Sequence, residues 1–484
     1  MHFYSTNNKD LRVSFEDALL TGMPPDYGLF MMAKADIPKL KPQAITDMRG
    51  KSYAEVALSV LTPFLSEEFD AETLKALLSD AYNPEQIQAP LQKVNENTDI
   101  LWLTKGPTCS FKDFAGRFFG RTLNHFLKKR GKRRLVVVAT SGDTGGAIAD
   151  ALHGLDAVFC VVLYPAEGVS EVQRRQMTTL GDNVYAVAVQ GDFDVCQALA
   201  KRLLNDMSYA SAVFGDSEFI TSANSISLGR LLPQIVFPFY AYSQMNVGVG
   251  EPIVLSIPSG NFGDMMGTAI AKQMGLPIEK IICGVNENKT FSDFLLTGEY
   301  NVRPAVYSPS SAMIVSHPSN VIRLIDLYDG HIYDERDSSG KVTKAGVIDI
   351  TPDMDALRRD IYSCSVDNAQ HFETMKKFFA DTGIIIEPHG AVGVETLQIY
   401  REQFDSRTHA VIFETADPAK FPADVITALD RAPETPAPIE RQKRLPERVF
   451  TMRQASIISP LLGKTCSDEQ YEELTQLIAS WKLI

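Results

Sequence analysis

Lys112 is the residue whose type and position first suggest chemistry. It follows a turn-rich stretch, Gly106 to Phe111, and begins a segment with helical character. A lysine in an apolar setting loses affinity for its proton because burial disfavours the ammonium form, and the neutral amine then forms a Schiff base with an aldehyde. The alternative is a lysine whose stem packs on a helix while its ammonium stays in water, and this motif by itself favours that alternative.

Two glycine-rich loops favour the Schiff-base interpretation of Lys112 over the solvent-exposed alternative. Thr140 to Gly146 follows the apolar run 135–139, and Pro258 to Asp264 follows the run 253–257, each before a helical stretch. A helix N-terminus presents unpaired N–H groups and the positive end of a dipole, so each loop is expected to bind an anion. Neither loop ends in Gly-Lys-Ser/Thr or spaces its glycines for a dinucleotide, which makes a nucleotide the weaker hypothesis. Taken singly, each loop is equally consistent with a tight turn whose aspartate caps the helix.

Alternating strand-like and helical patterns indicate the elements that must position these loops. The expected strands are 135–139, 158–163, 184–189, 253–257, 281–285 and 410–413. Such alternation favours a mainly parallel sheet with helices on both faces, where ligands gather at the carboxyl ends of the strands. Before Ile100, apolar positions three and four apart in 56–61 and 74–78 indicate a mainly helical part.

The sequence also suggests where the chain divides. We expect a helical domain over 1–96, a catalytic α/β region over 97–430, and a linker with a helical tail over 431–484. The proline-rich stretch from Arg431 to Pro438 is the clearest linker, and the polar stretch 329–341 is interpreted as a surface loop or hairpin.

Composition narrows the class of protein. The chain has 484 residues, a net charge of −13, 45% hydrophobic and 22% charged residues, which is typical of a soluble protein with more than one domain. The negative charge argues against binding nucleic acid or anionic membrane, and the basic run 128–134 is interpreted as a solvated turn. Six cysteines lack Cys-x-x-Cys spacing, and we find no apolar leader or spanning segment, so a cytoplasmic location is expected. The scattered histidines predict no metal site.

Lys112, the two loops and the motif Glu414 to Phe421 together resemble threonine synthase of the longer type found in yeast and many bacteria. Further similar segments are 13–30, 169–181 and 223–234, and the resemblance runs from about Phe15 to about Val425. It implies an α/β fold of the tryptophan-synthase β-subunit type (pyridoxal-phosphate fold type II), with two α/β lobes and a mainly helical N-terminal unit. The implied cofactor is pyridoxal 5'-phosphate, held between the lobes.

The resemblance implies a set of cofactor-binding residues. Lys112 would bind the aldehyde of the cofactor and transfer protons. The loop that would hold the phosphate consists of Ser259, Gly260, Asn261, Phe262, Gly263 and Asp264. Because a carboxylate repels phosphate, Asp264 is expected to cap the helix or orient the loop. Thr415 would meet the ring nitrogen and leave it largely unprotonated. Without its flanking motif, the favoured alternative for Thr415 is a strand-end hydroxyl bonded to the backbone.

A second set of residues is expected to bind substrate. Because the other loop is assigned to the cofactor, the substrate carboxylate would be held by Ser141, Gly142, Asp143 and Thr144. Asp143 could instead lie against the ring hydroxyl of the cofactor. Asn224, Ser225 and Arg230 follow, with Arg230 either a guanidinium fork for the substrate phosphate or a structural cation. His317, Asn320 and His389 are weaker candidates, for which packing or loop capping is favoured.

The implied reaction converts O-phospho-L-homoserine and water to L-threonine and phosphate, the last step of threonine biosynthesis. Two alternatives stay open: a phospho-lyase on the same fold that releases a 2-oxo acid, and a non-enzymatic anion-binding module. The sequence departs from the family pattern at Lys105 and Asp417, where histidines are usual, and at Ser5-Thr6-Asn7, where Ser-Thr-Arg is usual. We expect these departures to affect substrate preference rather than cofactor binding.

Overall fold

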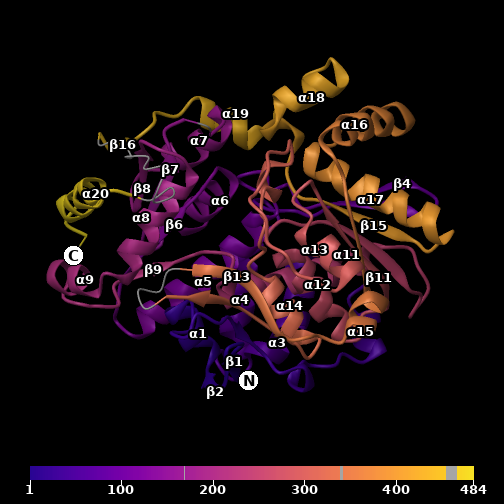
Figure 1. Ribbon diagram of the computed structural model, residues 1–484, viewed down its shortest axis with the longest axis horizontal. Helices are drawn as coiled ribbons and strands as arrows, with labels where there is room; N and C mark the ends of the chain where they lie inside the picture. The colour runs from indigo at the N-terminus through magenta and orange to yellow at the C-terminus, as the bar shows by residue number, and fades with distance from the viewer. Residues whose placement is uncertain (168, 338–341, 454–465, 484) are drawn as a thin grey trace. The chain divides into compact units, whose positions relative to one another are not determined.

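The computed structural model describes residues 1–167, 169–337, 342–453 and 466–483. The chain forms two compact units (Figure 1). Unit 1 consists of Met1–Leu19, Met23–Lys105 and Ser225–Glu434, and unit 2 consists of Leu20–Gly22, Gly106–Asn224 and Thr435–Ile484. The domain boundaries expected after residues 96 and 430 stay predictions.

Unit 2 is built on a five-stranded, fully parallel sheet with the order β16-β8-β7-β6-β9. Its strands are β6 (Arg134–Ala139), β7 (Val158–Pro165), β8 (Val184–Val189), β9 (Ile220–Ser222) and β16 (Val449–Thr451). The three strands predicted here from apolar runs are confirmed. β9 and β16 were not indicated by sequence, because three residues are too few to establish a periodicity.

The helices of unit 2 are α5 (Lys112–Lys129), α6 (Asp143–Leu152), α7 (Glu171–Thr178), α8 (Phe193–Asn205), α9 (Met207–Phe214), α19 (Ala437–Lys443) and α20 (Asp468–Ser480). One face of the sheet packs on α8 and α20, and Leu135, Leu199 and Leu474 belong to this core. The predicted helical tail is thus α20, which docks on the sheet of unit 2. Helix α19 begins inside the stretch that was expected to be a linker.

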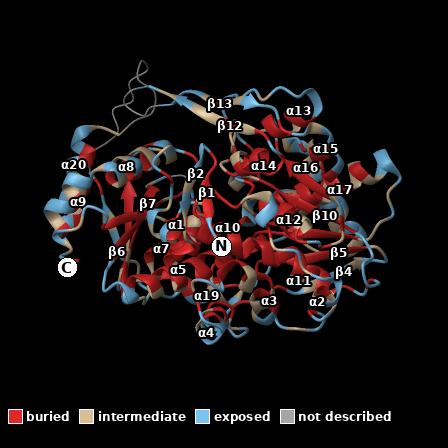
Figure 2. Cartoon of the chain, turned by 90° about the horizontal axis from the view of Figure 1, so that it is seen from below, coloured by how far each residue is buried: buried red, intermediate tan, exposed pale blue. Residues whose placement is uncertain are grey.

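Unit 1 contains a six-stranded sheet with the order β14-β11-β10-β15-β5-β4, in which only the β4–β5 pair is antiparallel. Its strands are β4 (Leu91–Asn95), β5 (Thr98–Trp102), β10 (Ile253–Pro258), β11 (Ile278–Val285), β14 (Ile361–Ser365) and β15 (Ala410–Glu414). The strands predicted at 253–257, 281–285 and 410–413 are confirmed. β5 and β10 are buried along their full length, as Figure 2 shows for the sheet interior.

The α-helices of unit 1 are α1 (Phe15–Thr21, whose last two residues belong to unit 2), α2 (Pro42–Thr46), α3 (Tyr53–Leu65), α4 (Ala71–Ala81), α10 (Leu228–Leu231), α11 (Val236–Gln244), α12 (Gly263–Gln273), α13 (Thr290–Thr297), α14 (Val321–Leu327), α15 (Met354–Asp360), α16 (Asn368–Thr382), α17 (Pro388–Phe404) and α18 (Pro422–Leu429). Short 3₁₀ turns lie at Lys34–Asp36, Leu232–Ile235, Ser311–Met313 and Pro418–Lys420. The periodic stretches 56–61 and 74–78 fall in α3 and α4, so both predicted helices are confirmed.

Short strands accompany the helices at the N-terminus. β1 (Phe3–Ser5), β2 (Asn8–Val13) and β3 (Phe30–Met31) form an antiparallel sheet of order β2-β1-β3. Sequence did not indicate them because β2 is mostly polar and exposed, which hides any alternation. The predicted hairpin is present as β12 (His331–Arg336) paired with β13 (Val342–Ile350), and its connection at 338–341 lies outside the described residues.

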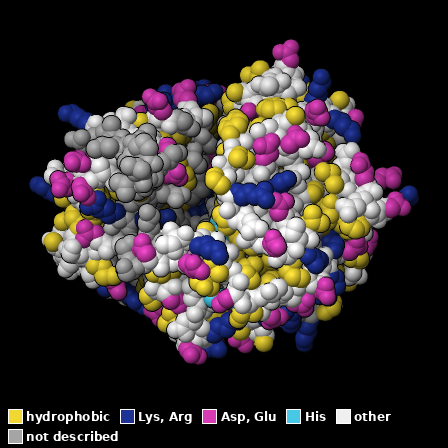
Figure 3. Space-filling model, in the orientation of Figure 1, with side chains coloured by type: hydrophobic (Ala, Val, Ile, Leu, Met, Phe, Trp, Pro, Cys, Tyr) yellow, Lys and Arg dark blue, Asp and Glu magenta, His cyan; other side chains and the backbone are white. Residues whose placement is uncertain are grey.

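The basic run 128–134 and the cysteines differ in how far they are buried. In the basic run, Lys128 pairs with Asp156 at 2.9 Å, while Arg134 is buried at the start of β6 and pairs with Asp216 at 2.8 Å. Only part of the run is therefore the solvated turn that was expected. Over the face drawn in Figure 3, Lys and Arg side chains are interspersed with Asp and Glu. Cys160 and Cys283 lie in the core as expected, and burial raises the pKa of each thiol to about 12.

Candidate active site

Lys112 is the first residue of α5 in unit 2. Its Nζ lies 4.7 Å from the centroid of the Phe111 ring and 3.8 Å from Oδ2 of Asp143. The Lys112 side chain is only 14% exposed, so the alternative of a lysine extended into solvent is wrong. A shielded amine beside a carboxylate has a partner to which it can transfer a proton.

The first glycine loop connects β6 to α6 by a tight turn. The hydroxyl oxygen of Thr140 accepts the N–H groups of Gly142 and Gly145, both at 2.9 Å. The hydroxyls of Ser141 and Thr144 bond to no residue that the structure describes, so they are available to a ligand. A helix start with unbonded hydroxyls is a place where anions bind, and the substrate-binding role of this loop stays a prediction.

Asp143 does not cap its helix. The N-terminal cap of α6 is Gly142, where no side-chain bond is made. Asp143 is instead buried, accepts a hydrogen bond from Nε2 of Gln173 at 2.9 Å, and faces Lys112. Gln173 also closes over the loop, because a Cβ at Gly142 would lie 2.4 Å from its Cδ. Nothing in the sequence pointed to Gln173 beyond its place in the similar segment 169–181.

Asn224 lies at the same edge of the unit 2 sheet as the first glycine loop. It follows β9, and β9 runs parallel to β6 with Ile220 opposite Leu135. Asn224 is exposed, and its backbone N–H donates to Oγ of Ser222 at 3.3 Å. The carboxyl ends of adjacent parallel strands lie together. The edge at which Asn224 lies therefore also carries Asp143, which faces Lys112, and the unbonded hydroxyls of Ser141 and Thr144.

The second glycine loop, residues 259–264, connects β10 to α12 in unit 1, and we call it the phosphate loop. Four consecutive backbone N–H groups donate to no described residue, those of Gly260, Asn261, Phe262 and Gly263. A Cβ at Gly260 would lie 2.6 Å from the carbonyl oxygen of Ala312, and one at Gly263 would lie 2.7 Å from Nε2 of Gln234. Both positions therefore require glycine because of close approach.

Asn261 is held at both of its acceptor groups. Ser319 donates its N–H at 3.3 Å and its hydroxyl at 3.2 Å to Oδ1 of Asn261. Asn320 donates its N–H at 3.2 Å and its Nδ2 at 2.8 Å to the Asn261 carbonyl. The exposed side-chain NH₂ of Asn261 has no acceptor in the described chain, so it is preoriented as a donor. The loop-capping role expected for Asn320 is confirmed.

The ends of the phosphate loop are more enclosed. Phe262 has a left-handed backbone, φ 61°, and packs edge-to-face on Phe291. Ser259 is buried and donates its hydroxyl to the carbonyl of Ile257 at 3.0 Å. Asp264 is buried in the first turn of α12 and accepts the N–H of Met265 at 2.9 Å. A bond to the helix start fits the orienting role that was expected of Asp264.

Thr415 directly follows β15, which runs parallel to β10 and adjacent to it. The phosphate loop and Thr415 therefore extend from neighbouring carboxyl ends of one sheet. Thr415 is buried, yet its hydroxyl makes no hydrogen bond to any residue in the described ranges, so the backbone-bonded alternative is wrong. Burial and the nearby Glu387 raise the pKa of Glu414, the residue before Thr415, well above its usual range.

Two arginines place positive charge inside unit 1. Arg230 in α10 is buried, and burial lowers its pKa to about 10. Arg323 in α14 is fully buried and donates to the carbonyl of Phe30 at 2.9 Å, the carbonyl of Ile226 at 2.6 Å, and Oδ1 of Asn320 at 2.6 Å. No carboxylate in the described chain pairs with Arg323. Ser225, near Arg230, is half-buried and offers an unbonded hydroxyl.

The remaining candidates have structural partners. Nδ1 of His317 lies 2.9 Å from the Tyr300 hydroxyl and Nε2 lies 3.2 Å from Asp334, so His317 is packed as expected. The two departures from the family pattern contact each other, because Nζ of Lys105 lies 3.0 Å from Oδ2 of Asp417. An ion pair thus occupies the two positions where the resemblance led us to expect histidines.

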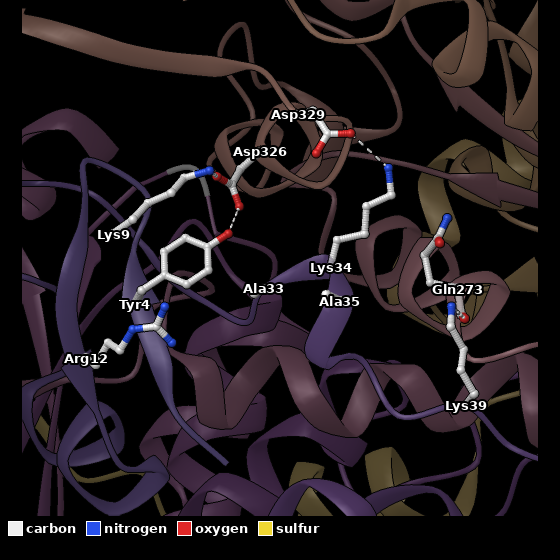
Figure 4. A pocket seen from close by; sticks show the side chains of 10 residues that line it. All are labelled: Tyr4, Lys9, Arg12, Ala33, Lys34, Ala35, Lys39, Gln273, Asp326 and Asp329. Atoms are coloured by element: carbon white, nitrogen blue, oxygen red, sulfur yellow. Dashed lines mark hydrogen bonds and ion pairs between the residues drawn. The ribbon is translucent and has the colours of Figure 1, made fainter.

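A pocket of about 540 Å³ lies elsewhere in unit 1 (Figure 4). Its walls carry Lys9 paired with Asp326 at 3.2 Å and Lys34 paired with Asp329 at 3.0 Å. None of the sequence-predicted site residues lines it. Since none of the lining residues belongs to either glycine loop, the pocket is separate from the candidate site. In the described residues, no cluster of His, Cys, Asp or Glu is arranged to hold a metal ion, and no helix is both long and apolar enough to span a bilayer.

Three family models match the chain. Residues 87–415 match pyridoxal-phosphate dependent enzyme, residues 2–82 match threonine synthase N terminus, and residues 390–458 match threonine synthase, C-terminal. Among curated proteins, threonine synthase from Pseudomonas aeruginosa is 34% identical over 460 residues, covering 92% of this chain and 95% of the relative.

Solved structures agree with the sequence matches. The pyridoxal-phosphate-bound threonine synthase from Brucella melitensis superposes with a TM-score of 0.87 at 30% identity, covering 100% of both chains. Threonine synthase from yeast gives a TM-score of 0.84 at 28% identity, covering 100% of this chain and 98% of the other. Similarity therefore extends over the full length of the chain.

Proposed function

The chain belongs to the threonine synthase family of pyridoxal-phosphate-dependent enzymes, and from that premise we propose how its own residues convert O-phospho-L-homoserine and water to L-threonine and phosphate. The observation that supports the proposal most strongly is the pairing of a shielded Lys112 amine with the buried Asp143. The fold is the expected pyridoxal-phosphate fold type II.

The residues present fit the cofactor. Four unclaimed N–H groups at residues 260–263 match a phosphate, and the glycines at 260 and 263 leave the space that a Cβ would fill. The unbonded hydroxyl of Thr415 suits a pyridine nitrogen as donor, and a hydroxyl leaves that nitrogen largely unprotonated. Lys112 supplies the amine. We propose that these groups act on one cofactor molecule.

When bound, pyridoxal phosphate supplies an aldehyde that captures the substrate amine and a ring that delocalises the electron pair left by proton removal. Lys112 then does the proton transfers: its Nζ removes the proton from the substrate Cα and next one from Cβ. Phosphate leaves from Cγ, and Lys112 returns one proton to Cγ, which becomes the methyl group. Water adds its hydroxyl at Cβ, and a second proton returned to Cα completes L-threonine. Asp143, which faces Lys112 Nζ at 3.8 Å, stabilises the ammonium each time a proton is taken up.

The proposed substrate contacts use the hydroxyls beside the first glycine loop and the buried guanidinium of Arg230. The hydroxyls of Ser141 and Thr144, with the amides at the start of α6, would bind the α-carboxylate. Asn224, Ser225 and Arg230 would bind the substrate phosphate, and burial makes the guanidinium charge of Arg230 act through a low dielectric. The substrate phosphate would thus be bound by the cationic side chain of Arg230, whereas the phosphate loop contains no lysine or arginine.

Product analysis tests the reaction. Purified holoenzyme incubated with O-phospho-L-homoserine should release L-threonine and inorganic phosphate in equal amounts. In water enriched in oxygen-18, the label should appear in the hydroxyl at Cβ, since that oxygen comes from solvent. A 2-oxo acid in place of threonine would instead establish a phospho-lyase. Absence of both products would leave the anion-binding module.

Thr415→Asp is expected to protonate the ring nitrogen and change both the visible spectrum with substrate and the ratio of threonine to side products. A carboxylate at that position holds a pyridinium, which withdraws electrons more strongly than the neutral ring. Thr415→Ser is the matched control, because it keeps a hydroxyl and should keep the wild-type spectrum. If Thr415→Asp leaves spectrum and product ratio unaltered, Thr415 does not contact the ring.

Arg230→Ala is expected to weaken binding of phosphohomoserine about ten- to a hundredfold while cofactor affinity hardly changes, because a charge-assisted hydrogen bond is worth roughly 1.5–3 kcal/mol. Arg230→Lys should restore little, since an ammonium lacks the planar fork. The comparison ligand is threonine, which has no phosphate. Substrate and threonine affinities are measured by titration, and equal losses for both ligands, or none for either, would assign Arg230 a structural role.

A further inference from the structure

A short turn of unit 1, residues Ser308 to Met313, packs directly on the phosphate loop. A Cβ at Gly260 would lie 2.6 Å from the carbonyl oxygen of Ala312 and 3.2 Å from Cα of Met313. The contact is thus between the backbone of the turn and the backbone of the loop. Any shift of the turn therefore moves the phosphate loop, and with it the amides at 260–263 that the proposed function assigns to the cofactor phosphate.

His389 in α17 holds one side of this turn. The N–H of Ala312 donates to Nε2 of His389 at 3.0 Å. A peptide N–H only donates, so Nε2 carries no proton. Nδ1 of His389 lies 2.6 Å from Oε2 of the buried Glu387. Oε2 also accepts the backbone N–H of His389, and Oε1 of Glu387 accepts that of Gly390. Nδ1 therefore bears the proton and donates it to a carboxylate that three donors satisfy.

His371 in α16 holds the other side of the turn with the same tautomer. Its Nδ1 lies 2.6 Å from the carbonyl of Asp367, which only accepts, so Nδ1 is the donor. Its Nε2, 2.9 Å from Oγ of Ser310, then accepts the serine hydroxyl. Oγ of Ser310 in turn accepts Nδ2 of Asn286 at 3.0 Å. His371 is fully buried, and burial lowers its pKa, which keeps the ring neutral.

Both imidazoles are thus neutral acceptors that face donors of one turn. Within the turn, the N–H of Ser311 bonds to the carbonyl of Pro309, that of Met313 bonds to the carbonyl of Ser310, and the hydroxyls of Ser308 and Ser310 lie 3.2 Å apart. If either Nε2 were protonated, a donor would face a donor, and a buried polar group left without its partner is costly. His371 in α16 and His389 in α17 therefore help to determine where the turn lies.

We propose that His389 and His371 are positioning residues for the cofactor phosphate, which hold the Ser308–Met313 turn on Gly260 through their unprotonated Nε2 atoms and so fix the amides of the phosphate loop. This inference rests on the proposed function, because it takes the loop as the seat of the phosphate. It assigns His389 and His371 no contact with substrate or cofactor.

Two amide variants test the roles of the two ring nitrogens of His389 separately. In His389→Gln the side-chain oxygen reaches the position of Nε2 and still accepts from Ala312. In His389→Asn the amide reaches only the position of Nδ1, so Glu387 keeps its donor while the N–H of Ala312 loses its acceptor. We expect His389→Asn to bind pyridoxal 5'-phosphate about ten- to a hundredfold more weakly than wild type, and His389→Gln to stay within about threefold.

Pyridoxal, which lacks the phosphate, shows whether the effect acts through the phosphate loop. Titration of each apoprotein with either compound gives two affinities, and their ratio is the readout. His389→Asn should lower the ratio while binding pyridoxal as wild type does, and thermal melts should show that both variants fold. An unchanged ratio in His389→Asn, or an equal drop in both variants, would overturn the role of Nε2.

Histidine nitrogen NMR of the wild-type protein supplies a test that needs no variant to fold. At neutral pH both His371 and His389 should show the neutral tautomer protonated at Nδ1, and a protonated Nε2 at either residue would overturn the proposal. The failure of the proposed function looks different: wild type would then bind pyridoxal 5'-phosphate no better than pyridoxal. If wild type discriminates and His389→Asn does so equally, only the positioning role fails.

Discussion

Lys112→Ala should reduce the formation of threonine by more than about 10⁴-fold and abolish the visible absorbance of lysine-bound cofactor, because one amine both binds the aldehyde and moves the protons. The fold should survive, since Asp143 keeps its hydrogen bond from Gln173 at 2.9 Å. Steady-state assays, an absorbance spectrum and a thermal melt measure these three expectations. Wild-type turnover in the variant would show that Lys112 is not the nucleophile.

Lys112→Arg is the sharper control. A guanidinium preserves the positive charge beside Asp143, so stability should stay near wild type. It cannot be deprotonated in a protein and so can neither capture an aldehyde nor act as a base. Activity should therefore be lost as completely as in Lys112→Ala. Activity retained in the arginine variant alone would mean that Lys112 contributes only its charge.

The features that sequence predicted are local ones. The run 135–139 is β-branched and continuous, which predicts a buried strand, and the glycines that follow it predict a turn before a helix. The phosphate loop has the same signals after 253–257. Each loop follows the carboxyl end of a parallel strand, where ligands gather, so both loops were expected to bind ligands, and that role stays a prediction.

The features that sequence missed depend on residues distant in the chain. Gln173 bonds to Asp143 across 30 positions. His389 was expected to pack or to cap a loop, but its partner Ala312, 77 positions away, was not indicated. Arg323 lies in a mostly apolar helix, where a lone arginine is ordinarily assigned to the solvent face, but it is fully buried. Nothing in spacing or composition distinguishes such residues, because tertiary packing alone gives them their partners.

Gly260→Val should weaken binding of pyridoxal 5'-phosphate by more than about a hundredfold. Its backbone φ is not in the left-handed region, so conformational freedom is not the reason for glycine here. The reason is space: the new Cβ would lie 2.6 Å from the carbonyl oxygen of Ala312, and a backbone atom cannot rotate away as a side chain does. Overpacking of this kind costs roughly 1–3 kcal/mol, and the displaced amides lose charge-assisted hydrogen bonds to the phosphate in addition.

Because the clash arises at Cβ itself, Gly260→Ala should lose most of the same affinity, whereas an effect of bulk alone would spare it. Gly298→Ala provides the matched control in unit 1: it strains a left-handed residue, φ 83°, but a Cβ there meets nothing within 4 Å. That variant should lose about 1 kcal/mol of stability and no cofactor affinity. Cofactor titration of all three variants decides the matter, since wild-type affinity in Gly260→Val would remove residues 259–264 from the phosphate site.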